Sequence, residues 1–584
     1  MNRIESLVGE SVANARVPRR VMAGLWGVAL LAGLLHVWPR RFALNNLDAV
    51  SYLDLADAWR LGRWGDAVNA YWSPAYSWAL AAALAVVRPS AEHQYVLLHA
   101  VNVVLFIAAL AALHLLVTEL VRDTPGPDTA STFSPAGFAT MAFLLFTWFA
   151  VTQLSVATES PDLIPTAATF AAGALLVRLR HRPGTMTTAA LGGILGAGYL
   201  GKAAMLPVAP VFILAAAMAA RSWRVALVAT AALAAVAGPW ILALSMATGR
   251  FNTGDAGRIN YLWLVNRSDD WPRHWPPHWP HWDGVEGRGE PLHPARRLHT
   301  APAVYEFATP FTAATYPMWF APAYWYEGVS PRFDLRDQLR RLRMSAADYL
   351  RLLTVTRDQP EYFNPQPALA ALLLALWLAG SAPTRWRVAW HVLLPAAAIL
   401  GTYALVRVAP RYVAGGVILT WVILLAGVRL ERGEAARRLA RAAQWTAGGI
   451  LALSIAVVTI SDTWARWSRM GGGDLHVSNP DWYLASRLQR AGLAPGTTVG
   501  VIGNAQVASR WARLAGVRIV AEVPAADVEQ FTEGDDATVR SVIAAFAQTP
   551  ARFVLAERPP LSAPADGWRR VTGTPYWLFT PEPR

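Results

Sequence analysis

The chain has 584 residues, of which 54% are hydrophobic, 16% are charged and none is cysteine, and its formal net charge is +13. Repeated apolar runs of about 17–25 residues match a hydrocarbon core of roughly 30 Å, which excludes a soluble globular protein, and the lack of cysteine excludes disulfides and thiolate metal sites. The positive charge lies in arginine clusters between these runs, as in cytoplasmic loops, so we expect no nucleic-acid partner.

The apolar runs predict an α-helical polytopic membrane protein with about 11–13 spans. If the arginine-rich loops are inside, the first apolar segment, 21–38, runs outward and is followed by an outer loop at 39–73. Three apolar segments then lead to the polar stretch 157–162, where an even number of crossings is required. We expect the short segment 74–88 to be re-entrant or fused with its neighbour, although the sequence does not settle this.

Later parts of the chain predict two further features outside the membrane. Residues 247–365 form a large outer segment. After the last apolar segment, 462–584 alternates between helical and strand patterns, which predicts a small extracytoplasmic α/β domain. We therefore expect a membrane domain at 1–461 in the plasma (inner) membrane, with the active site and the tail outside the cytoplasm.

The outer loop is rich in carboxylates and aromatic residues. Asp48 follows the first span directly, and Asp54 and Asp57 fall at helical spacing behind it, which predicts an amphipathic interfacial helix. An enzyme that moves a sugar from a lipid-phosphate donor needs a carboxylate to remove the acceptor's proton, and Asp48 is placed for that role. The alternative is that Asp48 only caps the helix. For Asp54 and Asp57 we expect a solvated helix face.

The run LDAVSYLDLA, followed by YWSPAYSW, resembles the first outer loop of the GT-C glycosyltransferase superfamily. That group includes protein O-mannosyltransferases, aminoarabinose transferases and lipopolysaccharide sugar transferases. Its members carry an Asp, often followed by a second acid, and then a Tyr and a Pro-Leu-Tyr-Pro-like turn. Here Ala49 replaces the second acid and the turn reads Ser-Pro-Ala-Tyr. The resemblance implies that Asp48 is the catalytic base.

Three further outer positions carry polar residues that are costly beside a span. Glu159 and Asp162 lie in TESPDLIP, and in similar transferases an acid in this loop helps to form the acceptor or metal site; a helix cap is the alternative. Lys202 is an outer lysine that meets a lipid phosphate or snorkels. Arg411 and Tyr412 begin a late span, and similar enzymes carry such a pair near the donor phosphate, which suits the planar guanidinium; an interfacial anchor is the alternative.

The large outer segment opens with a charged stretch and then a tryptophan-rich run. Asp255, Arg258 and Tyr261 follow a span directly and are candidates for substrate binding, with a charged turn as the alternative. The run WPRHWPPHWPHW at 271–282 repeats Trp every four residues, but its prolines forbid a helix. It predicts an extended rim that stacks on sugars or anchors in the interface.

Together these features predict an inverting glycosyltransferase that uses a polyprenyl-phosphate sugar donor and a glycan, lipid or protein acceptor at the outer face of the bilayer. Asp48 is the expected base. Arg411, with Lys202 and Arg258, is expected to hold the donor phosphate, and Glu159, Asp162 and Asp255 to line the acceptor side. A divalent cation such as Mg²⁺ or Mn²⁺ is compatible with these carboxylates, but no spacing demands it. A lipid or glycan transporter or flippase and a non-catalytic scaffold remain the alternatives.

Overall fold

A computed structural model describes most of the chain and divides it into two compact units. Unit 1 comprises Met1–Pro39, Asn102–Ala243 and Asp334–Arg466, and unit 2 comprises Arg40–Val101, Leu244–Phe333 and Trp467–Arg584. The described residues are 16–123, 133–266, 289–355, 363–379, 389–428, 434–470, 479–562 and 567–581. The tryptophan-rich run at 271–282 lies outside them.

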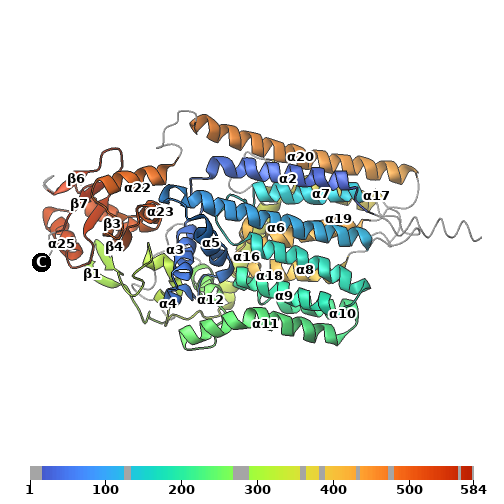
Figure 1. Cartoon of the computed structure of the whole chain (residues 1–584), viewed down its shortest axis with the longest axis horizontal. Helices are drawn as coiled ribbons and strands as arrows, with labels where there is room; N and C mark the ends of the chain where they lie inside the picture. Colours follow the sequence, from blue (N-terminus) through green and yellow to red (C-terminus); the bar gives the residue numbers. More distant parts are fainter. Residues whose placement is uncertain are drawn as a thin grey trace, which may run out of the picture. The chain divides into compact units, whose positions relative to one another are not determined.

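Unit 1 consists mainly of long apolar helices that run side by side (Figure 1). Seven helices in the described part of the chain are long and apolar enough to cross a membrane, and four shorter apolar helices accompany them. The polytopic helical class is confirmed, and the predicted number of spans stays a prediction. The helices of this unit are α2 (Arg19–Val37), most of α6 (Gln94–Arg122), α7 (Pro135–Val151), α8 (Leu163–His181), α9 (Thr185–Gly201), α10 (Ala209–Ala220), most of α11 (Trp223–Thr248), α16 (Leu335–Thr354), α17 (Gln366–Ala379), α18 (Trp390–Ala404), α19 (Pro410–Gly427) and α20 (Glu434–Met470).

Small residues allow α9 and α11 to approach closely. A Cβ atom added to Gly192 would lie 2.1 Å from the carbonyl oxygen of Ala229, and one added to Gly196 would lie 2.7 Å from the Cβ of Val236. Gly192 and Gly196 are four residues apart and so share one face of α9, the spacing by which glycines bring helix backbones together in membranes. The close contact between α9 and α11 therefore depends on glycine at positions 192 and 196.

In unit 2 the outer loop folds into α3 (Asp48–Arg60), α4 (Trp64–Ala67) and α5 (Pro74–Val87). Helix α5 has 14 residues, which at a 1.5 Å rise is about 21 Å and shorter than the hydrocarbon core. This length fits the prediction that segment 74–88 makes no full crossing. Helix α3 is present as predicted, but residues 49–56 are all buried, so it is not a solvated interfacial helix.

A seven-stranded sheet completes unit 2, in the order β1-β2-β4-β3-β5-β7-β6. The three central strands are parallel and are connected by helices, whereas the outer strands pair antiparallel. The strands are β1 (Arg296–Thr300), β2 (Ala303–Glu306), β3 (Thr498–Gly503), β4 (Arg518–Pro524), β5 (Phe553–Ala556), β6 (Trp568–Arg570) and β7 (Trp577–Phe579), and the helices are α22 (Pro480–Arg490), α23 (Ala505–Ala515), α24 (Val528–Thr532) and α25 (Asp536–Phe546).

The predicted α/β character of the tail is confirmed, because helices alternate with the parallel strands β3, β4 and β5. The sequence pattern did not indicate that β1 and β2 come from the large outer segment. They extend the sheet because β2 pairs with β4. The predicted division into a membrane domain at 1–461 and an extracytoplasmic domain at 462–584 stays a prediction.

Candidate active site and its charged clusters

Asp48 is the first residue of α3 and is half-buried. Its carboxylate Oδ1 accepts a hydrogen bond of 3.1 Å from the indole Nε1 of Trp319. Leu47, not Asp48, occupies the cap position, and the Asp48 backbone N–H donates to Asn46 at 3.3 Å. The carboxylate is therefore oriented by a donor 271 residues away in the sequence.

An aromatic cluster surrounds this hydrogen bond. The ring of Trp319 stacks on that of Trp263, with centroids 5.8 Å apart and planes at 16°, and Tyr71 contacts both indoles. Trp72 donates its indole N–H to the Phe320 carbonyl oxygen at 3.0 Å. The aromatic residues of the first outer loop thus hold the segment that carries Trp319.

Four residues that the sequence analysis singled out converge in unit 1. Asp162 precedes α8 and is 1% exposed, and its carboxylate contacts the ammonium of Lys202 and lies 3.4 Å from Nε of Arg411. The Lys202 ammonium lies 3.5 Å above the ring centroid of Tyr412. Lys202 and Arg411 thus meet at the carboxylate of Asp162, and this Asp162 cluster presents two cations of the kind that bind anionic groups. Lys202 is thus ion-paired and does not simply snorkel.

The loop before α8 buries a second carboxylate. Glu159 is 0% exposed, and Ser160 donates its hydroxyl to Asp162 Oδ2 at 2.9 Å. Ser160 therefore orients Asp162 from within the predicted TESPDLIP motif. Whether Glu159 contacts an acceptor stays a prediction.

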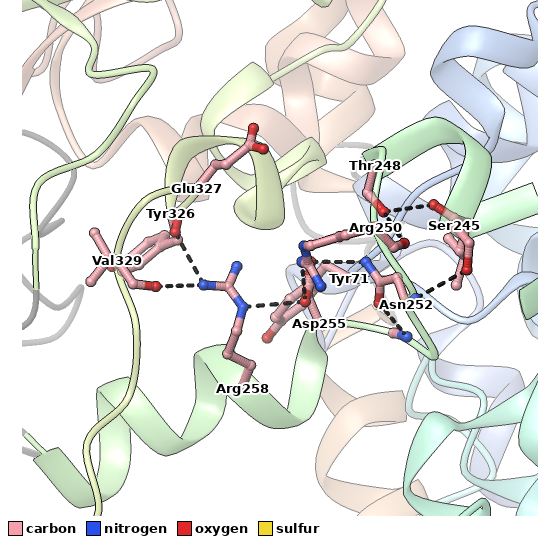
Figure 2. Close-up of polar contacts among 12 residues, drawn as sticks. Tyr71, Ser245, Thr248, Arg250, Asn252, Asp255, Arg258, Tyr326, Glu327 and Val329 are labelled. Carbon is pink, nitrogen blue, oxygen red and sulfur yellow. Dashed lines mark hydrogen bonds and ion pairs between the residues drawn. The ribbon is translucent and has the colours of Figure 1, made fainter.

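Asp255 lies between two guanidinium groups in unit 2 (Figure 2). Arg250 donates to both carboxylate oxygens at 2.8 and 2.7 Å, Arg258 donates through Nε at 3.2 Å, and Asn252 adds a bond of 3.2 Å. Arg258 also donates to the Val329 carbonyl at 2.5 Å. These bonds tie α12 (Ala256–Tyr261) to the turn at 326–329.

Substrate roles for Asp255, Arg258 and Tyr261 stay predictions. Asp255 is 4% exposed, and its carboxylate accepts four hydrogen bonds from protein groups. Arg250, whose side chain is 48% exposed, was missed in the sequence, although its position beside a span is the signal that singled out Arg258. Tyr261 ends α12 and is half-buried.

Arg513 of α23 was also missed. Its guanidinium donates to Asp54 Oδ1 at 2.9 Å and to Asp57 Oδ2 at 2.6 Å. Asp54 is 3% exposed, so the expectation of a solvated face at this position is wrong. In sequence Arg513 is an ordinary helix arginine, and no local signal distinguishes it.

Metal binding also stays a prediction. Across the described ranges, no group of three or more His, Asp or Glu side chains is placed to hold a metal ion.

No protein-family model and no curated protein matches the chain in sequence. Among solved structures, it is similar over 96% of its length to ArnT from Cupriavidus metallidurans bound to undecaprenyl phosphate, with 98% of that chain covered, a TM-score of 0.50 and 12% identity. ArnT is an aminoarabinose transferase of the GT-C class. The chain has the GT-C fold.

Two further solved structures are also similar to this chain. The apo form of the same ArnT gives a TM-score of 0.50 and 12% identity, over 96% of this chain and 97% of that one. The Archaeoglobus fulgidus oligosaccharyltransferase in complex with Zn and sulfate is more distant, with a TM-score of 0.45 and 13% identity over 92% of this chain and 67% of that one. The GT-C fold rests on the likeness to ArnT.

Proposed function

We propose that the chain is an inverting glycosyltransferase that moves a sugar from a polyprenyl-phosphate donor to an acceptor hydroxyl or amine at the outer face of the membrane. The orientation of Asp48 by Trp319 carries this proposal. A carboxylate that is half-buried, fixed by an indole N–H and surrounded by aromatic rings can accept the acceptor's proton as the nucleophile attacks the anomeric carbon. The lipid phosphate is the leaving group, so a single displacement inverts that carbon.

The Asp162 cluster supports the choice of an anionic donor. Lys202 and Arg411 present an ammonium and a guanidinium beside the buried carboxylate of Asp162, and both side chains are partly exposed, at 20% and 24%. Such groups bind phosphate oxygens through charge-assisted hydrogen bonds. The ArnT structure of the same fold is bound to undecaprenyl phosphate. We assign the donor phosphate to Lys202 and Arg411, and the acceptor roles of Glu159 and Asp255 stay predictions.

The experiment measures transfer of labelled sugar from a panel of polyprenyl-phosphate donors in membranes that contain wild-type protein or Asp48→Asn at matched abundance. We expect the variant to lose about 10²–10⁴ in rate, the usual contribution of a positioned general base. Asp66→Asn, in α4 of the same loop, is the matched control and should retain wild-type transfer. Lys202→Gln should raise KM for the donor more than it lowers kcat.

Each outcome separates the alternatives. Equal transfer by wild type and Asp48→Asn would remove Asp48 from the mechanism. Donor flux across proteoliposomes without any glycosyl transfer would favour the transporter. A protein that neither transfers nor transports in the presence of every donor and acceptor class would be the scaffold.

A further inference from the structure

The sheet domain of unit 2 contacts α3, the helix that begins with Asp48, through Arg513. Arg513 on α23 has an 11% exposed side chain, and it uses all three guanidinium nitrogens. Nη1 and Nη2 donate to Asp54 and Asp57 on α3, and Nε donates to the Gln94 side chain at 3.1 Å. A planar guanidinium that bridges two carboxylates fixes direction as well as distance. This contact is a buried clamp between α23 and α3.

The charge state of the clamp is set by its members. Burial alone would lower the pKa of Arg513, but the two carboxylates raise this pKa above its ordinary value. Burial alone would raise the pKa of Asp57, but Arg513 and Arg60 hold it below its usual range. Burial raises the pKa of Asp54 despite the adjacent Arg513, so the ionic part of the clamp is the Arg513–Asp57 pair. Removing the arginine would leave both acidic side chains without their shared hydrogen-bond donor.

A second connection reaches Asp48 from the same sheet through residues 315–319. On the sheet side, Ile519 N–H donates to the Thr315 carbonyl at 2.9 Å. On the helix side, Thr315 donates to Asp54 through its N–H and its hydroxyl, at 2.7 and 2.8 Å. Four residues later, Trp319 donates to Asp48. The segment thus links strand β4 to both ends of the Asp48–Asp54 stretch.

The clamp lies close enough to Asp48 to set its position. Asp54 is six residues after Asp48 on one continuous helix, a distance of about 9 Å at 1.5 Å per residue. A shift of the Arg513 end of α3 therefore moves the carboxylate of Asp48 relative to Trp319. Misplacement of a reacting group by about 1 Å costs on the order of 10²-fold in rate.

We propose that the sheet domain, β1–β7 with α22–α25, is a positioning device for the catalytic base and that Arg513 is its principal positioning residue. This inference rests on the proposed transferase activity. It assigns to the tail a role in the chemical step, which is distinct from substrate binding. It predicts that loss of the clamp lowers kcat and leaves KM for the donor nearly unchanged.

The test compares Arg513→Gln and Arg513→Lys with Arg487→Gln. Arg487 is the matched control, because its guanidinium lies over Tyr483 of its own helix, α22. We expect Arg513→Gln to lower kcat about 10- to 100-fold with KM within about twofold. Arg513→Lys, which keeps the charge but not the fork, should fall between wild type and Gln. Arg487→Gln should match wild type.

Hydrogen exchange of the peptide that covers α3 gives a readout that needs no substrate. In the Arg513→Gln variant we expect the amides of α3 to exchange faster while the abundance of the protein is unchanged. Peptides from β3 and β5 should exchange as in wild type. Unchanged α3 exchange would overturn the clamp. Faster exchange with wild-type kcat would overturn its role in positioning. Absence of transfer by wild type itself would overturn the proposed function, and that result is distinct from the other two.

Discussion

At the scale of single residues, the carboxylates of unit 2 differ in what surrounds them. Asp48 receives one indole N–H and stays half-buried, which suits proton transfer. Asp54 is enclosed by Thr315 and Arg513, which suits a fixed structural contact. Glu522 on β4 receives only a neutral donor among the contacts that the structure gives it, the Tyr316 hydroxyl at 3.0 Å. The hydrogen-bond donors around Asp48, Asp54 and Glu522 thus give these three acidic side chains different properties.

Glu522 predicts a pH dependence of stability. Burial raises its pKa to about 8 from an ordinary value of 4.5, although the Tyr316 hydrogen bond acts in the opposite direction. Because the folded state holds the proton more tightly than the unfolded state, this contribution is full below about pH 4.5 and is lost as pH rises towards 8. Thermal melts of purified wild type between pH 5 and 8 should show this loss, with a limiting slope of about 1.4 kcal/mol per pH unit.

Glu522→Gln should remove most of that slope while it keeps an acceptor for Tyr316. Glu529→Gln, at an exposed position on α24, is the control and should melt with the wild-type slope. Parallel curves for wild type and Glu522→Gln would contradict the assignment.

At the scale of elements, the spacing of apolar residues predicts helices well because a helix is a local structure. Helix α2 (Arg19–Val37) lies within two residues of the predicted segment 21–38 at each end. Proline at the first turn of α7 and α19 marks where each begins, since its missing N–H is unneeded there. These patterns do not predict which helices are in contact, because helix contacts depend on how side chains pack across the interface.

The contact between α9 and α11 provides an element-scale prediction. A methyl group on Gly192 would meet the backbone of Ala229, which cannot move aside as a side chain can. Gly192→Ala should therefore destabilise unit 1 by roughly 1–3 kcal/mol, the usual cost of overpacking. Reversible unfolding in mixed detergent micelles would measure this change.

Gly193→Ala is the adjacent control, because a Cβ there meets nothing within 4 Å. Alanine also favours helix over glycine by up to about 1 kcal/mol, so this variant should be neutral or stabilised. Equal stability of the two variants would show that the close approach at Gly192 does not govern the site.

At the scale of the whole molecule, the arginine clusters predict which ends of the helices face the cytoplasm. Arg178, Arg180 and Arg182 lie around the end of α8, next to the exposed Thr185. The sheet domain carries an exposed turn at Ala494. The lack of cysteine means that a single introduced cysteine is the only site for a maleimide.

We expect a membrane-impermeant maleimide to label Ala494→Cys in intact cells and Thr185→Cys only after permeabilisation. Labelling of both after permeabilisation is the control for accessibility. Labelling of Thr185→Cys in intact cells would invert the topology and place the proposed chemistry on the cytoplasmic side.

The sequence by itself determined the membrane class, most helices, the α/β tail and the position of Asp48 at the start of a helix after the first span. All of these depend on short-range patterns of hydrophobicity, charge and turn residues. Tertiary structure alone decided that Trp319 orients Asp48, that Arg513 holds α3, and that Lys202 and Arg411 meet at Asp162. These partners are far apart in the chain. As single residues Trp319 and Arg513 look like ordinary aromatic and basic side chains, and the sequence singled out Lys202 and Arg411 without showing that they share a carboxylate. Only packing gives them a common position.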